Sequence, residues 1–528
     1  MTGKRLLLGD EAIALGALNA GISGVYAYPG TPSTEITEFI QNHPLTAERG
    51  IHCRWCTNEK TAMEAALGMS YAGKRALVCM KHVGMNVCAD AFINSAITGV
   101  NGGLVVLAAD DPSMHSSQNE QTSIFYASFA MVPCLEPSNQ QEAYDMMDYA
   151  YTLSERLKLP VMVRIVTRLA HSRASVKTGP TKPMNPLHPA VDKNWVLLPG
   201  IARRQYDKLI EKHSLQVEAS ESSPYNIFRK VSGSETAVVA CGIAYNYVME
   251  AIENYNLNVD VLKISHYPMP MQKLMSFAKG RKTIIFCEDG YPGAEDVARR
   301  VIPWEVRIEG RLTGLLPRTG ELNPDNVAQA LGVKLPRKAA PSRLVAARPP
   351  QLCPGCGHRD VYAALNKVLE DYPNARVFGD IGWYTLGALP PFRTLSSCVD
   401  MGASITMAKG AADAGLYPAI AVIGDSTFTH SGMTGLLDCV NANSPITVII
   451  SDNLTTAMTG GQDSAGTSKY EAICTSLGVD PAHVRVVVPL PANMPEITRI
   501  IREEIEYKGL SVIIPRRECM QTLKRHKK

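Results

Sequence analysis

Two short apolar runs near the C-terminus constrain the fold more than any other part of the sequence. The first, residues 418–423, leads into Gly424-Asp425, and the second, residues 446–450, leads shortly into Asn453. Such runs, partly β-branched and closed by a turn, are typical of buried strands. The segment between them carries apolar residues at helical spacing: Met433, Leu436, Leu437 and Val440. The pattern predicts a strand–helix–strand unit with parallel strands and a right-handed crossover.

The polar residues after these two runs predict a site for a metal-bound diphosphate. Because parallel strands place their carboxyl ends on the same edge of the sheet, we expect Asp425 and Asn453 to lie close together there. Carboxylate and amide oxygens suit Mg²⁺, which also keeps water and phosphate ligands. Gly424 allows a close approach, and the following helix offers free N–H groups to an anion. The alternative is an ordinary strand–helix–strand unit with a polar turn, which leaves Asp425 without a role.

Composition excludes several classes of protein. A chain of 528 residues is long enough for about three domains with ample cores. A net charge of +3 gives no electrostatic footprint for nucleic acid. No apolar run reaches transmembrane length, and the N-terminus lacks the apolar core of a signal peptide. The 13 cysteines are scattered, as in a reducing compartment. We expect a cytoplasmic protein that binds neither nucleic acid nor a membrane.

The first 170 residues repeat a strand–loop–helix rhythm that predicts a doubly wound parallel sheet. A predicted strand at 24–28 ends in a Pro-Gly-Thr31 loop, either a ligand-binding loop or a plain turn. Glu59 opens a predicted helix, where the helix dipole alone favours an acid, and Glu64 is the other candidate carboxylate.

Segments rich in proline and polar residues predict the domain boundaries, one at 171–200 and a second at 336–350. The fold class is therefore α/β, with two doubly wound parallel-sheet domains flanking a smaller α/β domain. The predicted ranges are 1–175 for the first domain, 176–234 for a linker and helical segment, 235–340 for the smaller domain and 351–528 for the last domain.

The 28-residue step from Asp425 to Asn453 resembles the signature of thiamine diphosphate enzymes, in which a Gly-Asp-Gly/Ser turn precedes an asparagine. Over nearly its whole length, the sequence resembles the large subunit of indolepyruvate:ferredoxin oxidoreductase. The matching motifs are Tyr28-Pro-Gly-Thr-Pro-Ser-Thr-Glu35, Asn58-Glu59-Lys60, Met80-Lys-His-Val-Gly-Met-Asn86, Asp110-Asp-Pro-Ser-Met-His-Ser-Ser-Gln-Asn-Glu120, Leu352-Cys-Pro-Gly-Cys-Gly-His358, Gly379-Asp-Ile-Gly-Trp-Tyr-Thr-Leu-Gly387, Met401-Gly-Ala-Ser-Ile405 and Thr456-Ala-Met-Thr-Gly460.

The resemblance implies the site residues. Asp425, Asn453 and the backbone carbonyl of Thr455 would hold Mg²⁺. The diphosphate would be faced by Gly382, Gly402, Ala403, Ser404, Gly424, Ser426 and Thr427. In such enzymes the first domain (1–175) holds the aminopyrimidine ring of the cofactor, and Glu59 would supply the carboxylate to its ring nitrogen. The substrate pocket would be lined by Thr31, Lys81 and His82, although a lone histidine such as His82 is more often structural.

The resemblance also implies the reaction and the partners. Members of this family oxidise arylpyruvates with coenzyme A, and the products are arylacetyl-CoA, CO₂ and electrons for ferredoxin. A small β subunit completes the enzyme, which we expect to be a heterodimer or heterotetramer.

The sequence departs from the family pattern where the electrons leave. Related oxidoreductases hold a [4Fe–4S] cluster with a Cys-x₂-Cys pair and two distant cysteines. Cys353, Cys356 and Cys519 match three of these positions, but Trp383 stands at the fourth, and Cys398 lies fifteen residues later. A cluster on three thiolates and a pocket filled by the indole ring both remain open. Repeated Cys-x₂-Cys runs near the C-terminus are also missing, so we expect no ferredoxin-like domain.

Two other functions stay open on these grounds. A non-oxidative thiamine diphosphate-dependent 2-oxoacid decarboxylase would release an aldehyde, and Trp383 favours it. A regulatory subunit would bind thiamine diphosphate without chemistry. The presence of Glu59, Asp425 and Asn453 argues against that second alternative.

Overall fold

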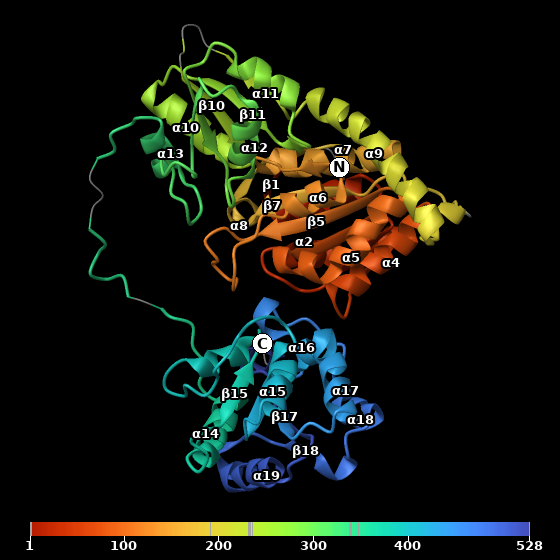
Figure 1. Cartoon of the computed structure of the whole chain (residues 1–528), viewed down its shortest axis with the longest axis vertical. Helices are drawn as coiled ribbons and strands as arrows, with labels where there is room; N and C mark the ends of the chain where they lie inside the picture. Colours follow the sequence, from red (N-terminus) through yellow and green to blue (C-terminus); the bar gives the residue numbers. More distant parts are fainter. Residues whose placement is uncertain are drawn as a thin grey trace. The chain divides into compact units, whose positions relative to one another are not determined.

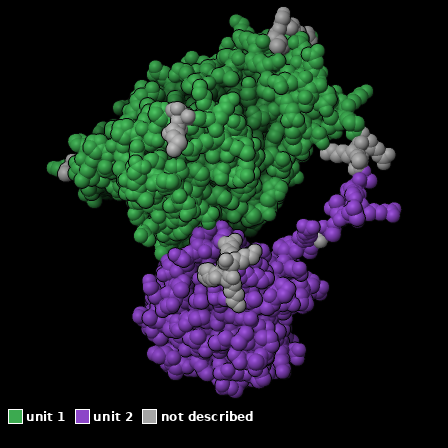
Figure 2. All heavy atoms as spheres, turned by 180° about the vertical axis from the view of Figure 1, so that it is seen from behind, with its two compact units in different colours: residues 1–339 green, residues 340–528 purple. Residues whose placement is uncertain are grey.

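The structure, a computed structural model, describes residues 3–190, 192–230, 234, 236–336, 340–346 and 348–526. The chain divides into two compact units, Met1–Ala339 and Ala340–Lys528, which are coloured separately in Figure 2. Both units contain largely parallel sheets with covering helices, so the predicted α/β class is confirmed.

A seven-stranded sheet forms the centre of the first unit, in the order β12-β6-β7-β5-β4-β2-β3. Its parallel strands are β2 (Gly24–Ala27), β3 (His52–Trp55), β4 (Ala76–Lys81), β5 (Leu104–Asp110), β6 (Cys134–Leu135) and β7 (Val161–Val166). Helix α7 (Gln140–Leu157) covers one face, and α4 (Glu59–Tyr71) and α5 (His82–Thr98) cover the other, as Figure 1 shows. The central strands are mostly apolar because neither face meets water, and the two buried charged residues Arg164 of β7 and Asp110 of β5 pair with each other.

A second, smaller sheet of the first unit has the order β14-β13-β10-β11-β9. Its strands are β9 (Phe228–Arg229), β10 (Thr236–Cys241), β11 (Asp260–Ile264), β13 (Thr283–Cys287) and β14 (Arg307–Glu309). Its helices are α10 (Ala244–Tyr255), α11 (Met271–Ala278), α12 (Gly293–Val301) and α13 (Pro324–Ala330). Strand β12 (His266–Tyr267) leaves this region and pairs antiparallel with β6. The predicted domain at 235–340 therefore contributes a strand to the seven-stranded sheet.

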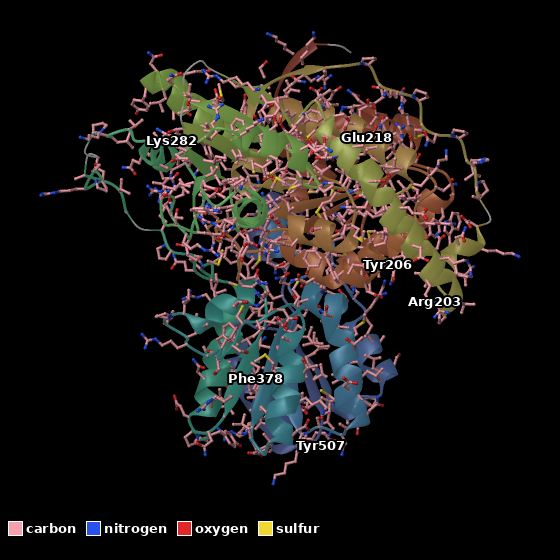
Figure 3. The ribbon with its side chains drawn as sticks, turned by 45° about the horizontal axis from the view of Figure 1, so that its top comes forward. Arg203, Tyr206, Glu218, Lys282, Phe378 and Tyr507 are labelled. Atoms are coloured by element: carbon pink, nitrogen blue, oxygen red, sulfur yellow. The ribbon has the colours of Figure 1, made fainter. Side chains whose placement is uncertain are left out.

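The segment predicted as linker and helix contains more structure than expected. Strand β8 (Arg173–Thr178) pairs antiparallel with the N-terminal strand β1 (Gly3–Leu8). Helix α9 (Pro199–Glu221) follows, with Arg203, Tyr206 and Glu218 along its length in Figure 3. Proline at the first helical position is favourable because its missing N–H would have no partner there.

The second unit contains a five-stranded parallel sheet in the order β15-β16-β17-β19-β18. Its strands are β15 (Arg376–Gly379), β16 (Ala419–Gly424), β17 (Ile446–Ser451), β18 (Val484–Val487) and β19 (Ser511–Pro515). The main helices are α14 (Gly357–Leu369), α15 (Ala403–Asp413), α17 (Met433–Asn441), α18 (Tyr470–Leu477) and α19 (Met494–Glu506).

The predicted strand–helix–strand unit is confirmed, since β16 and β17 pair in parallel with Gly424 opposite Ser451. The connecting helix starts earlier than predicted, directly after β16. It begins with α16 (Asp425–Thr427) and passes through a π-helical turn (Phe428–Gly432) into α17. Such π turns are frequent at functional sites. Among the helices in the described ranges, none combines the length and apolarity needed to cross a bilayer.

Candidate functional site

Asp425 and Asn453 lie against each other at the carboxyl edge of the second unit's sheet. One carboxylate oxygen of Asp425 accepts a hydrogen bond from the backbone N–H of Asn453 at 3.3 Å, and the other accepts one from the N–H of Ser426 at 2.7 Å. The side-chain oxygen of Asn453 accepts one from the N–H of Thr455 at 3.1 Å. Hydrogen bonds from backbone N–H groups therefore connect the three residues that would supply the magnesium ligands.

The surroundings of Asp425 suit a cation. The side chain is only 3% exposed, and burial raises the pKa of Asp425 to about 7, with the charge of Asp452 acting in the same direction. Asp452, which the sequence did not single out, is itself paired with Arg516 at 2.6 Å. A buried carboxylate is costly to ionise unless a cation or hydrogen bonds compensate it. A divalent ion at this point would remove much of that cost.

The predicted diphosphate residues 402–404 open α15, whose first turn can offer N–H groups to an anion. Gly402 has a φ of +94°, and a Cβ there would lie 2.7 Å from that of Ser431, so the position favours glycine. The hydroxyl of Ser404 donates to Asp380 at 2.6 Å. Burial raises the pKa of Asp380 to about 6.

The ring of Tyr384 packs against both predicted glycines of this region, Gly382 and Gly424. Its ring lies so close to Gly382 and Gly424 that a Cβ at either position would overlap it. Its hydroxyl donates to Asp380. The sequence reasoning missed both Tyr384 and Asp380, although both stand in the Gly379–Gly387 motif, where only Gly382 and Trp383 were considered. The remaining hydroxyls make local contacts: Thr427 donates to the carbonyl of Ile381 at 3.1 Å, and Ser426 contacts Thr456 at 2.7 Å.

A second group of predicted residues meets at the carboxyl edge of the seven-stranded sheet. Strands β4, β2 and β3 are neighbours and run parallel. Thr31 follows β2, Glu59 follows β3, and Lys81 and His82 stand where β4 passes into α5. The strand order therefore brings all four candidate residues to one edge, which is where open α/β sheets bind ligands.

Glu59 is held in the interior instead of facing solvent as an ordinary helix-start acid would. It is 5% exposed at the first position of α4. The helix is capped by Asn58, whose side-chain oxygen accepts a hydrogen bond from the N–H of Thr61 at 2.9 Å. A Cβ on Gly84 would lie 2.7 Å from Oε1 of Glu59, so the carboxylate rests on the first turn of α5.

Lys81 and His82 differ in charge. Burial lowers the pKa of Lys81 to about 8, while the charge of Asp111 acts in the opposite direction, so the ammonium group is mostly charged at neutral pH. Its Nζ donates to the carbonyl of Ser116 at 2.7 Å. His82 is fully buried, and burial lowers its pKa, which leaves a neutral imidazole. A Cβ on Gly30, beside Thr31, would lie 3.0 Å from that of Lys81, so the 29–33 loop packs on β4.

The three candidate cluster cysteines border one cavity of the second unit. Cys353, Cys356 and Cys519 line a space of about 330 Å³. Trp383 also lines this cavity and is 38% exposed, so the indole ring borders the space without filling it. Cys398 is not among the described residues around it. The indole ring therefore does not occupy the space between these cysteines.

Replacing Gly84 with Ala tests the placement of Glu59. Because the new methyl group would overlap the carboxylate, Glu59 must move, and a displacement of about 1 Å in a reacting group can cost about a hundredfold in rate. We expect a loss of that order in steady-state turnover with thermal stability little changed. Gly68→Ala in α4, where a Cβ meets nothing within 4 Å, is the matched control.

Two protein-family models match separate parts of this chain. Residues 15–195 match the family model described as "Pyruvate flavodoxin/ferredoxin oxidoreductase, thiamine diP-bdg", and residues 380–514 match "Thiamine pyrophosphate enzyme, C-terminal TPP binding domain". The two matched segments contain the two sheet edges described above.

Curated relatives named indolepyruvate oxidoreductase subunit IorA match almost the whole chain. The protein from Archaeoglobus fulgidus is 38% identical over 98% of this chain and 86% of its own length. Those from Methanothermobacter thermautotrophicus and Pyrococcus horikoshii are each 36% identical over 98% of this chain, and over 87% and 86% of their own lengths. The resemblance predicted from the motifs is confirmed. The chain belongs to the indolepyruvate oxidoreductase subunit IorA family and contains its two thiamine diphosphate-binding domains.

Proposed function

We propose that the chain is the catalytic subunit of a 2-oxoacid:ferredoxin oxidoreductase that acts on arylpyruvates such as indolepyruvate. The products are an arylacetyl-CoA, CO₂ and reduced ferredoxin. The observation that carries this proposal is the contact between Asp425 and Asn453 at the ends of two paired parallel strands, in a chain related throughout to IorA subunits. When bound, thiamine diphosphate supplies a nucleophilic carbon and an electron sink for decarboxylation.

The residues of the chain have distinct roles in this proposal. Asp425, Asn453 and the carbonyl of Thr455 hold Mg²⁺, while the first turn of α15 and the 424–427 turn bind the diphosphate. Glu59 holds the aminopyrimidine ring by a hydrogen bond to its nitrogen. Lys81 attracts the carboxylate of the oxo acid, since it is the charged member of its pair with His82.

The test uses the chain together with the small β subunit that we propose as its partner. The purified, cofactor-loaded complex should reduce ferredoxin or a viologen dye when it receives an arylpyruvate and coenzyme A, and arylacetyl-CoA should accumulate. Release of the aldehyde without dye reduction would instead establish the non-oxidative decarboxylase, the alternative that Trp383 favours.

The affinity for the cofactor should depend on pH through Asp425. Metal binding needs the ionised carboxylate, and its pKa of about 7 without metal means that a proton competes below neutrality. We expect the affinity for Mg²⁺ with thiamine diphosphate to fall about tenfold for each pH unit below about 7, and to level off above it. Fluorescence titration across this range measures the slope. Asp425→Asn, which cannot titrate, should lose this part of the pH dependence.

Electrons leave the site, in our proposal, through an iron–sulfur cluster held by Cys353, Cys356 and Cys519. Anaerobically purified wild-type protein should contain iron and sulfide and absorb broadly in the visible region. Cys356→Ser should lose most of both elements together with dye reduction. The exposed Cys398→Ser variant is the control and should keep them. Wild-type protein that is saturated with thiamine diphosphate but contains no iron would contradict the proposed cluster and leave the proposed reaction at the cofactor untouched.

A further inference from the structure

Three potential metal ligands of the first unit meet beside the 29–33 loop. Asp10 lies in the first turn of α1 (Gly9–Asn19), Glu35 in the first turn of α2 (Thr34–Asn42), and His171 ends α8 (Thr167–His171). One ligand atom of each lies within 4.8 Å of the other two. The Nε2 atom of His171 is 3.5 Å from Oε1 of Glu35.

Asp10 gives the cluster its unusual character. The residue is fully buried, and within the described structure neither of its carboxylate oxygens has a hydrogen-bond partner. Oε2 of Glu35 is also buried without a hydrogen-bond partner in the described structure. Glu11, the next acid along the chain, is by contrast used locally, because it accepts a hydrogen bond from the N–H of Leu8 at 2.8 Å. A buried carboxylate without hydrogen bonds is costly unless it is protonated, paired or bound to a metal.

Charge and access both favour a cation here. Oxygen atoms of the Asp10 and Glu35 carboxyl groups lie within 4.8 Å of each other, so a cation between them would relieve the repulsion of two ionised groups. The side chains of His171 and Glu35 are more than one-third exposed, so two of the three ligands are accessible from solvent.

We propose that Asp10, Glu35 and His171 bind a divalent transition-metal ion. Two carboxylates and one imidazole suit ions such as Mn²⁺ and Zn²⁺, and three protein ligands leave at least one position for water. The ion would tie together three elements that are distant in the sequence. Glu35 follows the 29–33 loop directly, so the ion would also fix the helix that anchors this loop.

Counting bound Mn²⁺ tests the site in the full-length chain. We choose Mn²⁺ because it prefers oxygen and imidazole ligands, and the 13 cysteines would compete for softer ions. Metal-free protein is titrated with Mn²⁺, and the free ion is measured by its electron paramagnetic resonance signal. Asp10→Leu and His171→Ala should each bind one equivalent less than wild type. Glu48→Gln, which removes an exposed acid, should bind as wild type does.

Two further measurements distinguish this site from other metal sites and from misfolding. Asp425→Asn should keep this equivalent, because its side chain belongs to the other unit. Pulsed electron paramagnetic resonance should show a nitrogen coupling to bound Mn²⁺, and His171→Ala should abolish it. This variant changes a partly exposed side chain, so we expect it to fold. Equal Mn²⁺ binding by wild type and by folded His171→Ala would contradict the proposed metal site. The buried carboxyl groups of Asp10 and Glu35 would then be explained by a proton that they share.

Discussion

Replacing Asp425 with Asn will lower the affinity of the chain for Mg²⁺ with thiamine diphosphate by at least about a hundredfold. Mutation of a residue that only hydrogen-bonds a metal ligand already lowers metal affinity by about 10- to 100-fold, and Asp425 is a proposed ligand itself. Asparagine keeps the volume of this nearly buried side chain and removes only its charge. Turnover will fall with cofactor occupancy. Isothermal titration calorimetry with the magnesium–cofactor complex measures the change.

The cofactor-free protein provides the check on folding. The pKa of Asp425 is raised to about 7, from about 3.9 in an unfolded chain, so its ionisation in the folded state costs stability as pH rises through this window. Above pH 7, Asp425→Asn should therefore unfold at the same temperature as wild type or higher. Asp438→Asn changes an exposed acid on α17 and should leave both stability and affinity unchanged. Wild-type affinity in Asp425→Asn would contradict the proposed metal site.

The central unit of the second sheet could be predicted from sequence because its determinants are local. Strands β16 and β17 are buried along their whole length and mostly apolar, with Thr447 and Ser451 as the polar residues of β17, and a helix of the right period separates them. Parallel pairing then fixes the edge at which Asp425 and Asn453 arrive. The same reasoning placed Thr31 and Lys81 at the ends of predicted strands, whereas Glu59 was predicted only at a helix start, and strand β3 before it was found in the structure.

Features set by distant contacts could not be predicted in this way. Strand β12 has two residues, too few to show any alternation, and it exists because β6 offers it an edge. Asp380 contacts Ser404 across 24 residues of sequence, and neither position has a periodic signal. Asp10 has the pattern of a helix-start acid, and only packing reveals that both its oxygens are buried without partners.

Glu59→Gln will abolish most of the catalytic activity while leaving the cofactor in place. The amide keeps the shape of a side chain that is 5% exposed and packed on Gly84, but it cannot exchange a proton with the aminopyrimidine ring. A positioned acid–base group contributes on the order of 10²–10⁴-fold to rate, and we expect kcat to fall by this factor in the ferredoxin or viologen assay.

Glu64→Gln distinguishes this role from a general effect of charge on α4. Glu64 is in the same helix, and its side chain is 48% exposed and paired with Lys60. Exposed pairs of this kind contribute on the order of 0.3–0.5 kcal/mol to stability, so this variant should keep nearly wild-type turnover and cofactor affinity. A comparable loss of kcat in both variants would mean that the negative charge of α4 as a whole matters, and would contradict a specific role of Glu59 in proton transfer. A large loss confined to Glu59→Gln, with thiamine diphosphate still bound, requires its carboxylate to act on the cofactor.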